Sequence, residues 1–203
     1  LSQPDQEVLH VLRQADYLSP KYHVVAANPP YMGGNGMNEP LREFVKINYS
    51  DSKVDLFSMF MERCLKFNIS KGFTAMINLP SWLFLSSFAR LREKILANTS
   101  IESLLHMGRG IFGIDWGSTA FVLCKKSNPN KVGRYYRLHK RNFQHIYADH
   151  IGELFLCAKT DERFQFNFDK YRDGDGVNFS TKSPQDGGQK IAYRANSADF
   201  KKI

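Results

Sequence analysis

Cysteines, long apolar runs and acidic residues are all scarce in this 203-residue sequence. The three cysteines share no CxxC spacing, which excludes a disulfide framework and a cysteine zinc site. The apolar stretch over residues 76–85 is interrupted by Asn78, Pro80 and Ser81, so no segment is long enough to span a bilayer. No charged and then apolar leader follows Leu1. These absences predict a cytoplasmic protein with neither a metal centre nor a membrane span.

The charge balance is basic, because 28 lysines and arginines face 20 aspartates and glutamates, a formal net charge of +8. A basic protein favours a polyanionic partner, nucleic acid first, although a solvated basic surface explains the same balance. Hydrophobic residues make up 42% of the chain and aromatic residues 13%, which excludes a disordered chain. A chain of this length is expected to form one domain around its own core.

Apolar runs of strand length alternate with amphipathic stretches of helix length as far as residue 138. The expected strands are 22–27, 74–79, 101–107, 119–126 and 134–138, and the expected helices are 3–17, 51–68 and 86–97. Two glycine-rich segments, 32–37 and 108–117, are predicted to be loops. This alternation is typical of an open, doubly wound α/β sheet. After residue 138 the periodicity fades, and we expect a short helix near residues 142–150, a strand or two and long loops.

Polar or aromatic residues follow three of the expected strands. The first strand is followed by Asn28-Pro29-Pro30-Tyr31, which we call the NPPY segment. The second is followed by residues 79–82, and the third by a glycine-rich loop that contains Phe112. Because open α/β sheets bind ligands at the carboxyl ends of their strands, these three loops predict a site on one edge of the sheet.

The residue types of the NPPY segment are suited to holding an exocyclic amine. Proline has a fixed φ and no backbone donor, so the carbonyls here are presented rigidly. The side-chain oxygen of Asn28 and the carbonyl of Pro29 can accept both hydrogens of the amine. Such a pair aims the nitrogen lone pair at an electrophile without a general base, and Tyr31 offers a ring for stacking. A pair of prolines after a strand is also an ordinary stop signal.

The NPPY segment, placed after an apolar strand, resembles motif IV of the γ-type amino-group DNA methyltransferases, which methylate the N6 amine of adenine. The similarity runs over about residues 17–126, through Val54-Asp-Leu-Phe-Ser-Met-Phe-Met-Glu-Arg, Gly72-Phe-Thr-Ala-Met-Ile-Asn-Leu-Pro-Ser-Trp-Leu, Ile111-Phe-Gly and Ser118-Thr-Ala-Phe-Val-Leu. Within that family, residues 32–38 and 48–57 resemble the PglX-type enzymes of BREX phage-defence systems. The resemblance implies the carboxyl-terminal part of a Rossmann-like class I methyltransferase sheet, followed by a mixed, loop-rich segment.

The resemblance also implies roles for single residues around the target base. Asn28 and the Pro29 carbonyl would hold the target amine, the second proline would shape the turn, and Tyr31 would stack on a flipped adenine. A second aromatic would cover the other face of the base. Two residues of the glycine-rich loop compete for that role, Phe112 and Trp116, and the match to the family favours Phe112.

The implied cofactor is S-adenosyl-L-methionine and the implied partner is duplex DNA, with other phage-defence components as further partners. Phe60 matches a position that packs near the adenine of the cofactor, although core packing at helical spacing explains it equally well. The main cofactor loop of the family precedes motif IV, and no such glycine-rich turn precedes Asn28 here. Phosphate contacts are expected from a basic run that could equally be a solvated strand edge: Lys125, Lys126, Arg134 and Arg137.

We therefore expect residues 1–138 to be a partial catalytic domain and residues 139–203 to begin a linker or target-recognition segment. The expected reaction is transfer of a methyl group from S-adenosyl-L-methionine to adenine in duplex DNA, as a host mark in phage defence. The isolated chain is expected to be inactive. Three alternatives remain open at this point: a non-catalytic DNA-binding module, methylation of a cytosine amine, and methylation of an RNA base or a protein glutamine.

Overall fold

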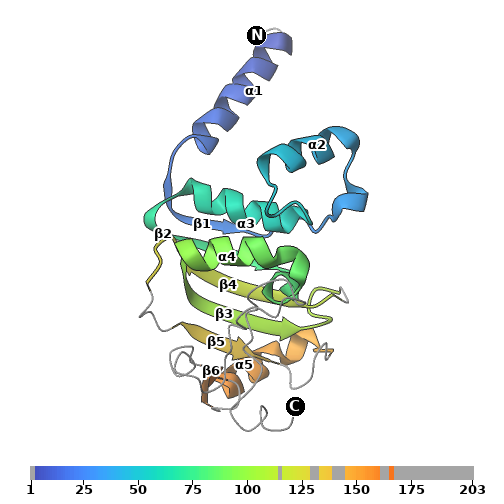
Figure 1. Ribbon diagram of the computed structural model, residues 1–203. Coiled ribbons are helices and arrows are strands. Elements are labelled where there is room, and N and C mark those ends of the chain that lie inside the picture. Colours follow the sequence, from blue (N-terminus) through green and yellow to red (C-terminus); the bar gives the residue numbers. More distant parts are fainter. Residues whose placement is uncertain (1–2, 114–115, 129–132, 139–144, 161–164, 167–203) are drawn as a thin grey trace.

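A computed structural model describes residues 3–113, 116–128, 133–138, 145–160 and 165–166 (Figure 1). Across these residues six strands form one sheet in the order β1-β2-β4-β3-β5-β6. The strands are β1 (Tyr22–Ala27), β2 (Asn68–Asn78), β3 (Ser100–Gly108), β4 (Ser118–Cys124), β5 (Arg134–Arg137) and β6 (Gln165–Phe166). The α-helices are α1 (Gln3–Leu18), α2 (Glu39–Asn48), α3 (Leu56–Phe67), α4 (Ala89–Asn98) and α5 (Ile151–Thr160). Short 3₁₀ helices are η1 (Gly34–Gly36), η2 (Pro80–Leu83), η3 (Ser86–Phe88) and η4 (Ala148–His150). The α/β class expected from the sequence is confirmed.

The directions of the strands decide which loops share an edge of the sheet. β1 and β2 are parallel, β4 is antiparallel to both β2 and β3, and β5 is parallel to β3. Strands β1, β2, β3 and β5 therefore point the same way, and β4 is a reversed strand between β2 and β3. The loops after Ala27, Asn78 and Gly108 leave from one edge, as predicted, and we call it the carboxyl edge.

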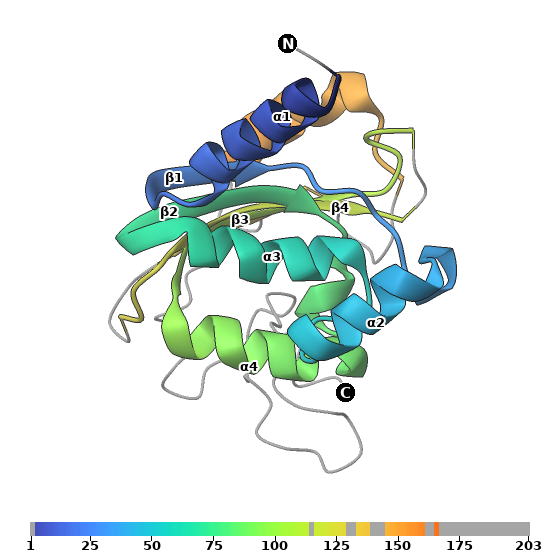
Figure 2. The ribbon, with the colours of Figure 1, turned by 90° about the horizontal axis from the view of Figure 1, so that it is seen from above.

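The main core lies between the sheet and the helices α3 and α4, which cover the same face (Figure 2). Its fully buried side chains come from both helices and from the strands beneath them: Phe57, Met61, Leu91, Ile95, Leu104 and Leu123. Burying an apolar side chain of this size stabilises the fold by about 1.5–3 kcal/mol. This layer fixes the start of α3 relative to the ends of β1 and β2, where the predicted site lies.

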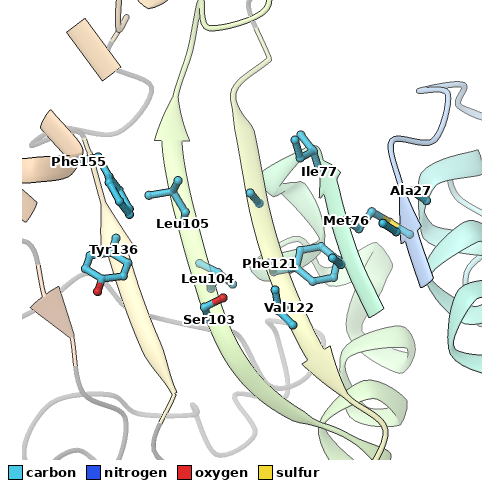
Figure 3. A pocket seen from close by; sticks show the side chains of 13 residues that line it. Ala27, Met76, Ile77, Ser103, Leu104, Leu105, Phe121, Val122, Tyr136 and Phe155 are labelled. Atoms are coloured by element: carbon cyan, nitrogen blue, oxygen red, sulfur yellow. The ribbon is translucent and has the colours of Figure 1, made fainter. Parts of the chain in front are cut away.

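α5 lies on the opposite face beside β5, whereas α1 is exposed along its described residues and projects away from the sheet past β1 (Figure 1). α5 packs on the sheet through Phe155, whose ring lies 5.5 Å from that of Tyr136. Beside this contact an apolar cavity of about 460 Å³ opens over the middle strands, with Ile77, Leu105 and Val122 among its lining residues (Figure 3). Among the described residues, no helix is long and apolar enough to cross a membrane.

The helix predicted over residues 51–68 is shorter at both ends in the structure, where it is α3. β2 follows α3 without a loop. α3 begins at Leu56 because Asp55 caps it, and it ends at Phe67. β2 then begins at Asn68, well before the predicted residue 74, because Asn68 pairs with Tyr22 of β1. The Asn68 side chain donates to the carbonyl of Phe73 at 3.0 Å. That side chain also accepts a hydrogen bond from Thr74, so it ties the irregular start of β2 to the regular strand.

Two helices differ from the expected pattern. α2 was not anticipated, although Asn38 caps it by accepting a hydrogen bond from the Leu41 amide at 3.1 Å. The helix expected near residues 142–150 falls partly outside the described residues, and α5 begins only at residue 151, after η4. The division predicted at residue 138 stays a prediction, while α5 and β6 add residues beyond 138 to the same sheet.

Candidate active site

The NPPY segment leaves the carboxyl edge at the end of β1. The side chain of Pro29 is buried, whereas Asn28 and Pro30 are exposed and Tyr31 is half-buried. The Tyr31 ring meets the buried ring of Phe57 edge-on, with centroids 6.3 Å apart and planes at 89°. Burial raises the pKa of Tyr31 above its ordinary value, so the phenol stays neutral at pH 7. One proline thus anchors the segment while the amide of Asn28 faces solvent.

The residues after Tyr31 are tied to the start of α3. The Met32 amide donates to the Asp55 carboxylate at 3.0 Å, and the Leu56 amide donates to the Met32 carbonyl at 3.0 Å. Gly33 and Asp55 form an antiparallel bridge. Burial raises the pKa of Asp55, while hydrogen bonds from the backbone amides of Phe57, Met32 and Leu56 act in the opposite direction. The backbone directly after the NPPY segment is therefore held against the start of α3.

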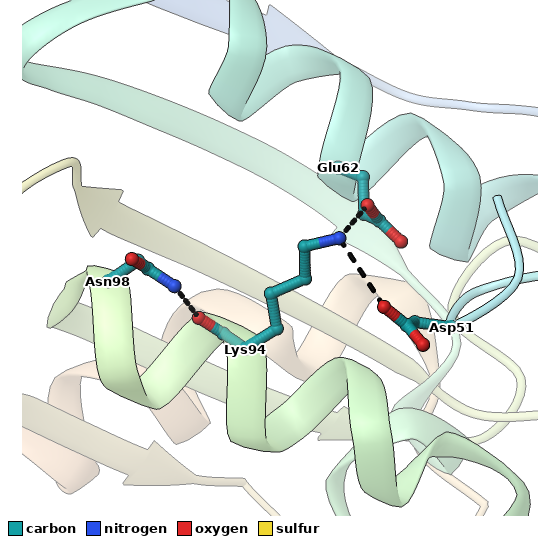
Figure 4. Close-up of polar contacts among 4 residues, drawn as sticks. All are labelled: Asp51, Glu62, Lys94 and Asn98. Carbon is teal, nitrogen blue, oxygen red and sulfur yellow. Dashed lines mark hydrogen bonds and ion pairs between the residues drawn. The ribbon is translucent and has the colours of Figure 1, made fainter. Parts of the chain in front are cut away.

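A salt-bridged cluster braces the segment that leads into Asp55 (Figure 4). Lys94 of α4 contacts the Glu62 carboxylate of α3 at 2.6 Å and the Asp51 carboxylate at 3.5 Å. The Glu62 side chain is only 5% exposed, whereas that of Lys94 is 47% exposed. The cluster links two helices and the loop before α3 at one point.

The loop after β2 is held by buried polar groups. The Asn78 side-chain oxygen accepts hydrogen bonds from the Trp82 indole at 3.1 Å and from the Thr119 hydroxyl at 2.9 Å. Arg92, fully buried, donates to the carbonyls of Trp82 at 2.9 Å and Leu85 at 2.6 Å. Burial lowers the pKa of the Arg92 guanidinium below its ordinary value. These bonds make the second loop a rigid wall of the site.

The loop after β3 presents Phe112 to solvent. Gly110 has a φ of +87°, which favours glycine, and a Cβ atom there would lie 2.3 Å from the exposed His145 ring, so a larger residue is strained at this position. Ile111 is buried against a small apolar cluster, which anchors the loop. Phe112, the next residue, is 54% exposed. The loop is thus fixed at its base with an aromatic ring at its tip.

The rings of Tyr31 and Phe112 are on the same edge but are not in contact. β1 and β3 are separated by two strands, so their ends lie about 14 Å apart. Trp116, the competing aromatic, is 73% exposed and lines a cavity of about 450 Å³ that Gly33 and Pro80 also line. This cavity adjoins the first two loops of the edge, and Phe112 is not part of its lining.

Phe60 lies on α3, one turn from its N-terminus and about 6 Å along the helix axis. Its side chain is 39% exposed, whereas the neighbouring Met59 and Met61 are buried. Phe60 is therefore not a fully buried core residue, and its ring is accessible to a ligand. The role near a cofactor stays a prediction.

The structure does not bring three of the four basic residues to the site. Lys125 and Lys126 follow the end of β4, and Arg134 begins β5, all at the edge opposite the NPPY segment. β4 is seven residues long, which separates the two edges by about 20 Å. Lys125 also donates to the Asn68 carbonyl at 2.8 Å. Arg137 ends β5 on the carboxyl edge, and the phosphate contacts of all four residues stay a prediction.

Sequence reasoning gave no role to Asp55, although the structure places it at the centre of the site. An aspartate directly before a helical pattern predicts an N-cap, and Val54-Asp55-Leu56 carries that signal. The second bond, to the Met32 amide, joins residues 23 positions apart and has no local signature. Among the described residues, no group of three or more histidines, cysteines or carboxylates could hold a metal ion.

Residues 3–112 match the model of the family described as Eco57I restriction-modification methylase. The adenine-specific methyltransferase BrxX of Escherichia coli O9:H4 (strain HS) is 39% identical over 143 residues, 68% of this chain and 12% of that protein. The adenine-specific methyltransferase PglX of Lacticaseibacillus casei (strain Zhang) is 38% identical over 136 residues, 65% of this chain and 11% of that protein. The chain thus spans about an eighth of the length of these curated relatives.

Solved structures show the same fold at low sequence identity. A modification subunit of a putative type I restriction enzyme from Vibrio vulnificus YJ016 has a TM-score of 0.59 and 12% identity, covering 89% of this chain and 39% of that one. A DrdV–DNA complex has a TM-score of 0.55 and 16% identity, covering 77% of this chain and 18% of that one. The match over residues 3–112 includes the NPPY segment and the helices and strands that hold it. The chain belongs to the Eco57I restriction-modification methylase family.

Proposed function

We propose that this chain carries the target-amine site of a DNA methyltransferase that modifies the N6 amine of adenine. The observation that carries the proposal is the NPPY segment at the carboxyl end of β1, with Asn28 exposed and Tyr31 braced against Phe57. The Asn28 amide oxygen and the Pro29 carbonyl would accept the two amine hydrogens. Two such acceptors leave the nitrogen lone pair directed away from them, toward an electrophile.

The target adenine has to leave the duplex to reach this edge. Unstacking and unpairing a base costs a few kcal/mol, and an aromatic stack returns about 1–3 kcal/mol. We assign the first stack to Tyr31, which is half-buried and held in place. We assign the second to Phe112, whose loop would have to close over the base, because the ends of β1 and β3 lie about 14 Å apart. The NPPY segment would thus both hold the amine and stabilise the flipped base.

The cofactor in this proposal is S-adenosyl-L-methionine, which supplies an electrophilic methyl group on its sulfonium. The residues of this chain fit part of its site, because Phe60 offers an accessible aromatic ring on α3. Residues 33–36 follow β1, but residues 34–36 form the 3₁₀ helix η1 and not the N-terminus of an α-helix, so they do not form a dinucleotide loop. We propose that this chain contributes the acceptor side of the reaction and one wall of the cofactor site.

The biological role that we propose is marking of host DNA in phage defence, with residues 139–203 beginning a linker or target-recognition segment. The relatives BrxX and PglX support adenine as the substrate by their names. Duplex DNA is preferred over RNA or protein glutamine because the chain carries a net charge of +8 and a neighbour of the same fold was solved with DNA.

The test is methyl transfer from tritiated S-adenosyl-L-methionine to unmethylated plasmid DNA, using the full gene product that contains residues 1–203. Asn28→Ala should lower the rate at least about 100-fold, because it removes one of the two acceptors. Asn98→Ala is the matched control, since that amide only donates to the Lys94 carbonyl of its own helix. Wild-type activity in Asn28→Ala would overturn the proposal.

A further inference from the structure

A single oxygen atom, Oδ1 of Asp55, joins the NPPY segment to α3. It accepts a hydrogen bond from the Phe57 amide at 3.2 Å, which is the ordinary bond of a helix N-cap. The same atom accepts a hydrogen bond from the Met32 amide at 3.0 Å. An N-cap needs only the first of these bonds, so the second is an additional contact to the residue that follows Tyr31.

The two bonds fix Tyr31 from two directions. Its main chain is held through Met32, whose amide meets Asp55 and whose carbonyl accepts from the Leu56 amide at 3.0 Å. Its ring is held by Phe57, the residue whose own amide Asp55 caps. A shift of the Asp55 side chain would therefore displace both supports of the Tyr31 ring together.

We propose that Asp55 is a positioning residue of the methyl-transfer site, which sets the Tyr31 ring where a flipped base must stack. This inference rests on the function proposed above. In this role Asp55 acts through the backbone of residues 31–33, and it also lines the cavity that adjoins the first two loops of the edge. A misplacement of about 1 Å in such a site costs about 100-fold in rate, so the contact matters for turnover even though it lies behind the reacting atoms.

Three substitutions separate this role from capping. Asp55→Asn keeps an oxygen at the Oδ1 position and so keeps both bonds. Asp55→Ser keeps a good N-cap for α3, but its hydroxyl is one bond shorter and does not reach the Met32 amide. Thr99→Val is the matched control, since it removes a hydroxyl that bonds the Ile95 carbonyl at 2.7 Å at the opposite edge of the sheet.

The variants are measured in the full gene product as turnover, KM for S-adenosyl-L-methionine and Tm. Asp55→Ser should lose at least about tenfold in turnover, with the KM for the cofactor unchanged and a Tm within about 2 °C of wild type. Asp55→Asn and Thr99→Val should stay within about twofold of wild-type turnover. Wild-type turnover in Asp55→Ser would overturn the proposal, and so would an equal loss in Asp55→Asn.

Amide hydrogen exchange distinguishes this proposal from the function on which it rests. Peptides that cover residues 31–36 should exchange faster in Asp55→Ser than in wild type or Asp55→Asn. Absence of methyl transfer by the wild-type protein would refute the proposed function while the exchange result still reports the Asp55 contact. Unchanged exchange in Asp55→Ser would refute the positioning role whatever the activity.

Discussion

Replacing Lys94 by methionine should destabilise the fold more than its half-exposed position suggests. The reason is Glu62, whose side chain is 5% exposed and whose Oε2 atom lies 2.6 Å from the lysine amine. The other oxygen, Oε1, is buried without a hydrogen-bond partner among the described residues. Methionine retains most of the apolar stem but leaves the buried carboxylate unpaired.

The expected loss in the free energy of unfolding is about 2 kcal/mol. An exposed ion pair contributes about 0–1 kcal/mol, and removing the partner of a fully buried charge costs about 3–5 kcal/mol. This pair lies between those limits, because the carboxylate is buried while the ammonium is partly solvated. A loss of that size lowers the Tm of a domain this large by about 4–8 °C.

Urea unfolding of wild type and variants measures the loss. Lys46→Met, a lysine-to-methionine change at an exposed position of α2, is the matched control and should cost less than about 0.5 kcal/mol. The double variant Lys94→Met with Glu62→Gln should recover about half of the loss, because it removes the buried charge itself. A Lys94→Met protein within 0.5 kcal/mol of wild type, on the order of experimental error, would show that the buried Glu62 carboxylate does not need its partner.

The same cluster predicts a pH dependence. The hydrogen bond that the Lys94 ammonium donates to the Glu62 carboxylate is the main reason that the pKa of Lys94 is raised above its ordinary value. The stabilisation is therefore fully present below the unfolded-state pKa of about 10.4 and is lost as the pH rises through the higher folded-state value. Wild type should lose more stability than Lys94→Met in that alkaline range, and parallel losses would contradict this assignment.

Two further predictions concern the loop after β3 and the basic residues. Gly110→Ala should cost about 1–3 kcal/mol, because its Cβ would meet the His145 ring at 2.3 Å with φ at +87°, and His145→Ala should recover part of the loss in urea unfolding. Full stability of Gly110→Ala would contradict the loop geometry. Arg137→Ala should weaken DNA binding more than Lys126→Ala, since only Arg137 lies on the carboxyl edge. Anisotropy titrations at several salt concentrations test this, and equal losses would argue against DNA binding at that edge.

Local patterns predicted the elements that position the site. β1 has the predicted bounds, because an apolar run of strand length stops at two prolines. The shared edge followed from the order of strands and helices. The position of Lys126 could not be predicted from the sequence pattern. Hydrophobic periodicity does not reveal that β4 is reversed, and this reversal places Lys126 at the opposite edge of the sheet. The hydrogen bond between the Met32 amide and Asp55 could not be predicted either, because it joins residues that are distant in the sequence.

The identity of the methylated nucleoside tests whether the NPPY segment holds the amine of adenine. Unmethylated DNA is incubated with S-adenosyl-L-methionine and the full gene product, then digested to nucleosides for mass spectrometry. We expect N6-methyladenine from wild type and from Thr99→Val, and at least about 100-fold less from Asn28→Ala. N4-methylcytosine as the product, or equal N6-methyladenine from Asn28→Ala, would contradict this expectation.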